Sequence, residues 1–206
     1  MPHLDTPAQP FRPLTAVLFG LSGCLVDFGA LSRLQTAWQP TPERLQATPG
    51  ALESLQYLER QGIPCAWLEQ LPDTSTRQLA AALPEWIEPT PATTIPWPAP
   101  DACWQALMAL KVKGLDGCVL VSGEPHLLQS GLNAGLWTIG LASCGSLCGL
   151  PPSEWQALSQ QERELKRGKA TVQLFGLGVH SVIDHLGELA TCLEDIGLRR
   201  LKGEKP

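Results

Sequence analysis

The feature that most constrains the fold is a regular alternation of short apolar runs with segments that carry helix signals. Residues 16–19, Ala-Val-Leu-Phe, are continuously apolar and are followed by Gly20 and Gly23. A short run of this kind is typical of a strand buried on both faces of a sheet. Thr48-Pro49 then begins a helix with a stripe of leucines on one face, because Pro is favoured at the first helical position.

The same alternation continues to the end of the chain. Further strands are predicted over residues 63–68, 86–87, 118–121, 136–141 and 180–184. Helices are predicted over residues 73–83, 101–113, 127–133, 154–168 and 186–196. Ser153 with Gln156 forms a capping box for the fourth of these helices, and Gly197 ends the fifth. Prolines recur through residues 88–100 and predict a loop without strand or helix.

Strands and helices in this order predict an α/β fold, a three-layer sandwich with an open parallel sheet. The length of 206 residues predicts one domain over residues 1–206, with residues 1–13 as a flexible N-terminal arm. Ligands of open parallel sheets bind beyond the carboxyl ends of the strands. Chemistry is therefore expected at residues 20–24, 68–72 and 122–126.

Charge and hydropathy exclude several classes of function. Lys and Arg number 15 against 20 Asp and Glu, which gives a net charge of -5, so a nucleic-acid partner is not expected. The apolar run over residues 14–28 is too short for a membrane span, and Asp27 interrupts it. We expect a cytoplasmic protein without membrane contact.

The seven cysteines predict buried, reduced thiols rather than a disulfide framework, because most lie in apolar surroundings and none forms a C-x-x-C pair. Cys144 and Cys148 have a spacing that two metal ligands can use, but no further His or Cys pair follows at zinc-site spacing. No metal site is expected there.

The segment after the first predicted strand carries a family resemblance. Residues 18–29 read Leu-Phe-Gly-Leu-Ser-Gly-Cys-Leu-Val-Asp-Phe-Gly. They resemble the first motif of the haloacid dehalogenase-like superfamily, which in its phosphonoacetaldehyde hydrolase (phosphonatase) branch reads D-x-A-G-T-T-V-D-F-G. Residues 130–141, 155–159 and 202–206 are similar to later segments of that branch. The resemblance implies a haloacid dehalogenase-like core and a hydrolase ancestry.

The chemistry of that family implies four kinds of residue. A carboxylate after the first strand attacks phosphorus, and a Ser or Thr after the second strand holds a phosphoryl oxygen. A Lys or Arg offsets the developing charge, and acids after the fourth strand help to hold Mg²⁺. This sequence departs from the pattern at each corresponding position: Gly20, Ser22, Glu69, Trp97, Ser122 and Gly123. We therefore expect no catalytic residue, no metal and no cofactor, with Mg²⁺ bound only if residual activity exists.

The family's cap domain is also expected to be missing. Residues 30–48, between the first motif and the next helix, are too few for the helical cap that the family inserts there. Phosphonatases use a cap Lys to form a Schiff base with the aldehyde, and this chain has no Lys before Lys111.

Four side chains near the strand ends are candidates for binding a ligand or a partner: Trp97, Glu69, Glu124 and Asp27. The position of Asp27 favours a structural or loop-capping role over that of a displaced nucleophile. Glu69 and Glu124 lack a third oxygen ligand for a cation, which favours solvated charges at a cleft rim. His126 is expected to face solvent at the start of a helix.

Trp97 stands where the family has its cation, and it is expected to project into the altered cleft. Either it is an exposed anchor for a protein partner, together with the loop over residues 88–100, or it packs into the core. We interpret the chain as a phosphonatase-like pseudoenzyme that binds a protein partner or a ligand; its oligomeric state is not determined by the sequence. The alternatives are a phosphohydrolase with a rewired site at Glu69, Glu124 or Asp27, and a sensor that holds an anion on backbone N–H groups.

Overall fold

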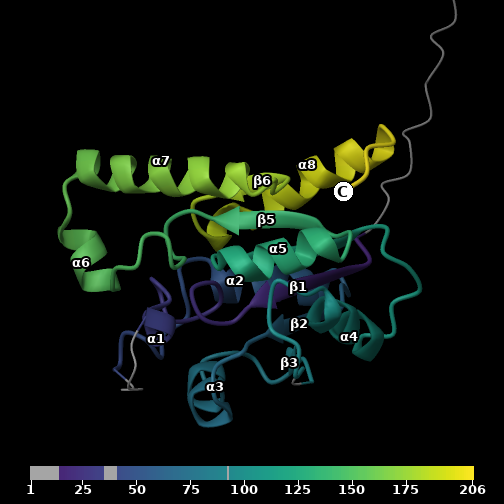
Figure 1. Ribbon diagram of the computed structural model, residues 1–206, viewed down its shortest axis with the longest axis horizontal. Coiled ribbons are helices and arrows are strands. Elements are labelled where there is room, and N and C mark those ends of the chain that lie inside the picture. Colours follow the sequence, from purple (N-terminus) through teal and green to yellow (C-terminus); the bar gives the residue numbers. More distant parts are fainter. Residues whose placement is uncertain (1–13, 35–40, 92) are drawn as a thin grey trace, which may run out of the picture.

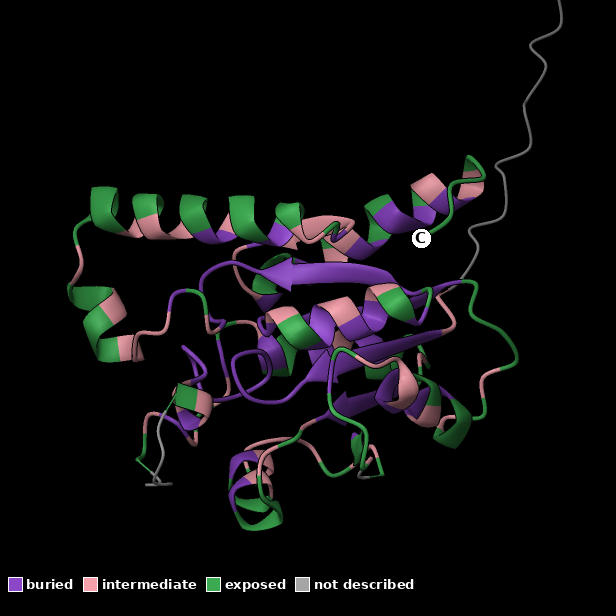
Figure 2. Cartoon of the chain, in the orientation of Figure 1, coloured by how far each residue is buried: buried purple, intermediate pink, exposed green. Residues whose placement is uncertain are grey.

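The computed structural model describes residues 14–34, 41–91 and 93–206. Six parallel strands form one sheet in the order β3-β2-β1-β4-β5-β6 (Figure 1). The strands are β1 (Ala16–Gly20), β2 (Cys65–Leu68), β3 (Glu88–Pro89), β4 (Cys118–Ser122), β5 (Trp137–Leu141) and β6 (Ser181–Ile183). The central strands β1 and β4 are the two continuous apolar runs, and every residue in them is buried (Figure 2).

Helices cover both faces of this sheet. They are α1 (Leu31–Leu34), α2 (Ala51–Arg60), α3 (Asp73–Ala80), α4 (Asp101–Ala109), α5 (Pro125–Asn133), α6 (Pro152–Ala157), α7 (Gln160–Gly176) and α8 (Leu189–Leu201), with a 3₁₀ turn at Leu186–Glu188. Phe19 and Val121 pack with α2 and α8 on one face, whereas Leu18 and Leu120 pack with α4 and α5 on the other. The predicted three-layer α/β sandwich is confirmed.

The third strand lies two residues later than predicted. Residues 86–87 are not a strand; Glu88 and Pro89 pair instead with Ala66 and Trp67 of β2. The prediction that residues 88–100 contain no strand is therefore wrong at its first two positions. Pro is tolerated there because β3 is the edge strand and its missing N–H leaves no bond unmade inside the sheet.

Several helix boundaries also differ from the prediction; α3 ends at Ala80 rather than at residue 83, and α4 ends at Ala109 rather than at residue 113. The predicted helix over residues 154–168 is two helices, because Leu158 and Ser159 are extended and the capping box is formed by Ser159 with Glu162. Gly197 does not end the last helix; it is buried inside α8. Gly203, with a φ of 87°, follows the end of α8 and supplies the left-handed residue that commonly terminates helices.

The connection from β1 to α2 is short and is tied to the loop that follows β1. In its described part it contains one helix, α1, and no inserted domain. Val26 forms an antiparallel bridge with Ala47, and the Thr48 N–H donates to the Leu25 carbonyl at 2.9 Å. The predicted arm over residues 1–13 lies outside the described residues. No described helix is long and apolar enough to cross a membrane.

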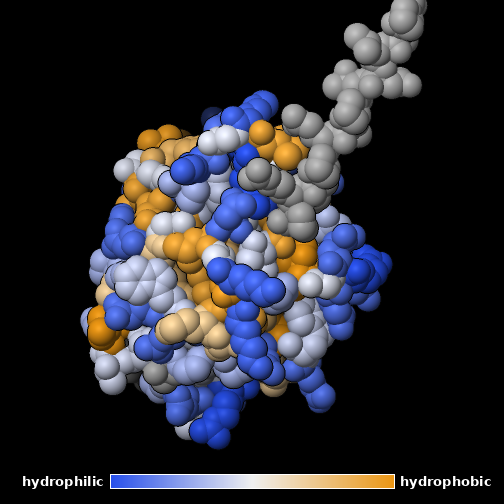
Figure 3. Space-filling model, turned by 90° about the vertical axis from the view of Figure 1, so that its right-hand side faces the viewer, coloured by the Kyte–Doolittle hydropathy of each residue, from blue (hydrophilic) through white to orange (hydrophobic). Residues whose placement is uncertain are grey.

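All seven cysteines are free, and all except the half-buried Cys192 are buried. Burial raises the pKa of Cys65 to about 12 and that of Cys103 to about 11, so these thiols remain protonated and unreactive near neutral pH. The end of the molecule shown in Figure 3 carries hydrophobic groups interspersed with hydrophilic ones rather than one continuous apolar face.

Candidate functional site

The carboxyl ends of β1 and β4 meet at Gly20 and Ser122. The register places Phe19 beside Val121, so the two residues that follow them are neighbours. A Cβ atom on Gly20 would lie 2.7 Å from Ser122 Oγ and 3.2 Å from a methyl group of Leu127. Ser122 Oγ is itself fixed, because it accepts the Glu124 N–H at 2.9 Å. A side chain at position 20 would therefore require the Ser122 hydroxyl to move.

The loop after β4 is closed by contacts between backbones. A Cβ on Gly123 would lie 2.3 Å from the carbonyl oxygen of Gly23 and 2.4 Å from Cα of Gly145. A Cβ on Gly145 would in turn lie 2.3 Å from the Gly123 carbonyl oxygen. Backbone atoms cannot swing aside as the end of a side chain can. The loops after β1, β4 and β5 are packed too closely for any side chain at position 123.

These residues do not fit the Mg²⁺ that the fold family implies. Hard cations require several oxygen ligands, usually with carboxylates among them. Gly20 and Gly123 supply no side-chain oxygen, and the Ser122 hydroxyl is occupied by the Glu124 amide. In the described part of the chain, no three His, Cys, Asp or Glu side chains gather into a metal site.

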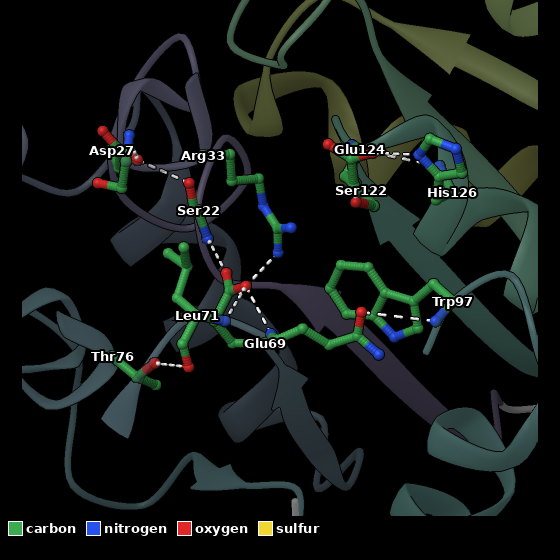
Figure 4. A network of polar contacts seen from close by, with 12 residues as sticks. Ser22, Asp27, Arg33, Glu69, Leu71, Thr76, Trp97, Ser122, Glu124 and His126 are labelled. Atoms are coloured by element: carbon green, nitrogen blue, oxygen red, sulfur yellow. Dashed lines mark hydrogen bonds and ion pairs between the residues drawn. The ribbon is translucent and has the colours of Figure 1, made fainter. Parts of the chain in front are cut away.

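Glu69, directly after β2, is the centre of the polar network at the strand ends (Figure 4). Its carboxylate accepts three backbone N–H groups, from Ser22 at 3.1 Å, Gln70 at 2.7 Å and Leu71 at 3.1 Å. It also forms an ion pair with Arg33 of α1. Its side chain is only 1% exposed. Burial raises the pKa of Glu69, while the Arg33 charge and the three amides act in the opposite direction.

The prediction of a solvated Glu69 at a cleft rim is therefore wrong. The physical reason is that the backbone amides of two loops and one guanidinium converge on this carboxylate and replace the water it loses on burial. The same amides are the groups on which an anion sensor would depend. These amides already bind the carboxylate of Glu69.

Trp97 is covered by Arg33, the arginine that is paired with Glu69. Its exposure is 8%, and it packs in the core cluster with Leu68 and Leu127. The Arg33 guanidinium carbon lies 4.7 Å from the centroid of the Trp97 ring, a distance at which a cation is attracted to the ring face. The interpretation of Trp97 as an exposed anchor is wrong, and the alternative, Trp97 packed into the core, is what the structure has.

Asp27 has the structural role that was predicted. Its Oδ2 accepts the Ser22 hydroxyl at 2.6 Å and the Ser32 N–H at 3.0 Å, and the residue is fully buried. Its φ of 56° is left-handed, a conformation that Asp tolerates better than most residues. Asp27 thus fixes the turn that leads from β1 to α1, and with it the position of Arg33.

Glu124 is not a solvated charge either. It precedes α5, accepts the His126 N–H at 3.3 Å, and is 8% exposed, as suits an acidic group at a helix N-terminus. Its Oε1 lies 3.1 Å from Nδ1 of His126, whose side chain is 73% exposed. The predicted position of His126, facing solvent at a helix start, is confirmed.

Arg33 is the residue of this network that sequence analysis missed. It belongs to no motif, and its partner Glu69 is 36 residues away. The one available signal was a carboxylate in a position where the resemblance implied a hydroxyl, since a carboxylate beside buried strands needs a cationic partner.

The open space near the strand ends lies to one side of Gly20. A groove of about 990 Å³ lies between α3 and residues 87–90 and 93–96, and its lining includes Arg77, Thr76 and Thr90. Glu69 is among its lining residues, whereas Gly20 and Ser122 are not.

No family model matches the chain. A phosphonoacetaldehyde hydrolase from Salmonella enteritidis PT4 is 27% identical over 164 residues, which are 76% of this chain and 61% of that protein. The chain thus spans about three-fifths of the length of that curated relative. A crystal structure with 61% identity covers 94% of this chain, is itself covered over 100% of its length, and has a TM-score of 0.91. A phosphonoacetaldehyde hydrolase-like protein from Oleispira antarctica has 22% identity, a TM-score of 0.83, and coverage of 95% of this chain and 97% of that one. It shares the fold.

Proposed function

Because this chain belongs to the haloacid dehalogenase-like superfamily, in its phosphonoacetaldehyde hydrolase-like branch, we propose that it is a member that has lost hydrolysis and acts by binding a protein partner or a ligand. The observation that carries this proposal is steric. At one of the metal-acid positions, Gly123, the backbones of two loops leave no room for a side chain, and at the nucleophile position, Gly20, a Cβ atom would lie 2.7 Å from Ser122 Oγ.

Loss of these groups removes both parts of the reaction. Phosphoryl transfer through an aspartyl intermediate needs a carboxylate aligned with phosphorus, and Gly20 has none. Positioning and charge stabilisation supply the rest of the rate enhancement. The amide donors that remain near the strand end are taken by the Glu69 carboxylate. A phosphoryl group entering this place would meet a buried negative charge.

The competing hypothesis is a phosphohydrolase that uses Asp27, Glu69 or Glu124. All three carboxylates already have partners inside the protein: Asp27 holds a turn, Glu124 caps α5, and Glu69 is paired with Arg33. A nucleophile must face its substrate, whereas these groups face their own chain. The structural engagement of the three acids supports the binding role over the rewired enzyme.

The loss of hydrolysis is tested with purified protein, Mg²⁺, and either phosphonoacetaldehyde or p-nitrophenyl phosphate. We expect no turnover above the background of a mock purification. The variants Asp27→Asn, Glu69→Gln and Glu124→Gln serve to separate contamination from real activity. Turnover that co-purifies with the chain and disappears in one of these variants would contradict the proposal.

We place the binding role at the groove beside α3, because it adjoins the end of β2 and combines threonine side chains with the apolar surfaces of Trp67 and Ile87. Arg77→Glu reverses an exposed charge on the lining of this groove. A partner captured by the wild-type chain should be lost by this variant. Lys169→Glu makes the same charge change on exposed α7 and should retain the partner. Equal retention by both variants would exclude the groove.

A further inference from the structure

A second pocket lies at the same end of the sheet. It has a volume of about 240 Å³, and it is lined by Phe28, Glu43, residues 46–49, Ser143, His185 and three residues of α6, namely Pro152, Trp155 and Gln156. None of its lining residues belongs to the network around Glu69. Its volume suits a small ligand rather than a protein segment.

The walls of this pocket are tied to one another by hydrogen bonds. The Asp27 N–H donates to the Arg44 carbonyl at 3.1 Å, and the Thr48 N–H donates to the Leu25 carbonyl at 2.9 Å. The Ser153 hydroxyl donates to Glu43 Oε2 at 3.2 Å. Residues 43–48 are thereby held against the loop after β1 and against α6. A ligand would enter a preformed site and would not have to order the chain.

Two aromatic rings line the pocket. The rings of Phe28 and Trp155 have centroids 6.1 Å apart and planes inclined by 53°. This is a tilted arrangement, so neither ring covers the face of the other. Aromatic faces carry negative charge density, and they attract a cation placed over them.

The lining carries one carboxylate. It belongs to Glu43, and none of the described residues that line the pocket is a Lys or an Arg. The imidazole of His185 also lines the pocket, and its Nδ1 accepts the Gly187 N–H at 3.2 Å. The remaining polar groups are uncharged side chains, among them Gln46 and Gln156.

From the aromatic pair, the single carboxylate and a described lining without Lys or Arg, we propose that this pocket binds a small organic ammonium ion. The ammonium group lies against Trp155 and Phe28 and is balanced by Glu43. A neutral compound of the same shape lacks both attractions. The inference does not depend on whether the chain has lost hydrolysis, because it involves none of the residues at Gly20 or Glu69.

The test uses choline and its uncharged isostere 3,3-dimethylbutan-1-ol as probes for the full chain. We expect titration calorimetry to show saturable binding of choline and at least tenfold weaker binding of the isostere. Equal affinity for the two compounds, or no saturable binding of choline, would overturn the proposal.

Variants then locate the site. Glu43→Gln and Trp155→Leu should each weaken choline binding about tenfold or more, since the loss of about 1.4 kcal/mol is a factor of ten. Trp155→Phe retains an aromatic face and should bind more tightly than Trp155→Leu. Glu154→Gln removes an exposed charge from α6 outside the pocket lining and should bind as the wild type does. Circular dichroism confirms that each variant is folded. Unchanged binding by folded Glu43→Gln would overturn the proposal.

Discussion

Replacing Arg33 with Met tests whether Glu69 is a buried charge held by its partner. The substitution keeps an unbranched apolar stem over Trp97 but removes the guanidinium. Breaking a buried pair by removing one member typically costs about 3–5 kcal/mol, because the other charge stays buried without compensation. Glu69 would keep its three backbone donors, and the Arg33 side chain is 17% exposed. We therefore expect the low end of this range, about 3 kcal/mol.

The loss should depend on pH in a definite direction. Burial raises the pKa of Glu69 above its ordinary value of 4.5. At a pH well below 4.5 the carboxyl is neutral in both the folded and the unfolded chain, and its burial as a charge costs nothing. As pH rises through the folded-state pKa, the unfolded chain has already lost the proton, so the free energy of unfolding falls. Without Arg33 the folded-state pKa is higher still and the fall is larger.

The assay is urea denaturation of the wild type and Arg33→Met at pH 4.5 and pH 8, with Arg77→Met as control. Arg77 is an exposed arginine of α3, and its replacement should change stability by less than about 0.5 kcal/mol at either pH. The difference between wild type and Arg33→Met should reach about 3 kcal/mol at pH 8, or roughly 6–12 °C in Tm for a chain of this size. It should be smaller at pH 4.5. A difference below about 1 kcal/mol at pH 8, set against the expected range, or one that does not change with pH, would refute the reasoning.

Two glycine substitutions test how closely the strand ends are packed, and a third tests an exposed glycine that has room for a side chain. Gly20→Asp alone should leave the protein without Mg²⁺-dependent phosphatase activity, because its Cβ meets Ser122 Oγ at 2.7 Å and the metal acids remain missing. Phosphatase activity from this one change would show that the site is intact enough to repair. Gly123→Ala should lower the free energy of unfolding by about 3 kcal/mol or more, since its Cβ would lie 2.3 Å from the Gly23 carbonyl oxygen, and a denaturation curve that matches the wild type would contradict this. Gly168→Ala, in exposed α7 with nothing within 4 Å of the added Cβ, should raise the free energy of unfolding by about 0.5–1 kcal/mol in the same assay.

The sequence was sufficient to predict the sheet because its central strands are short, continuous apolar runs, a pattern that depends on no distant residue. Helix boundaries were less predictable where two signals compete. Ser153 and Ser159 are both followed three residues later by Gln or Glu, and only the extended backbone at Leu158 decides that the second box is the one formed. The sequence predicts a helix end at Gly197, because sequence alone does not show that this glycine packs inside α8.

At the strand ends, the sequence predicted which groups are missing but not what replaces them. A glycine in place of a nucleophile is visible in the sequence, whereas the contact between Gly123 and Gly145 depends on how closely three loops pack. The burial of Glu69 depends in the same way on Arg33, whose position follows from the turn that Asp27 holds. Such long-range pairs have no local signal, and so the exposed Trp97 and solvated Glu69 were predicted from position alone.

The contact between Gly123 and Gly145 also limits the order in which mutations can accumulate. An Asp at position 123 places its Cβ against the backbone of two other loops, so the change is damaging unless those loops have separated first. Separation of the loops without a side chain at position 123 would leave a gap between them. A side chain at position 123 and the separation of the loops therefore each depend on the other. The packing of three loop backbones blocks a single substitution at this position.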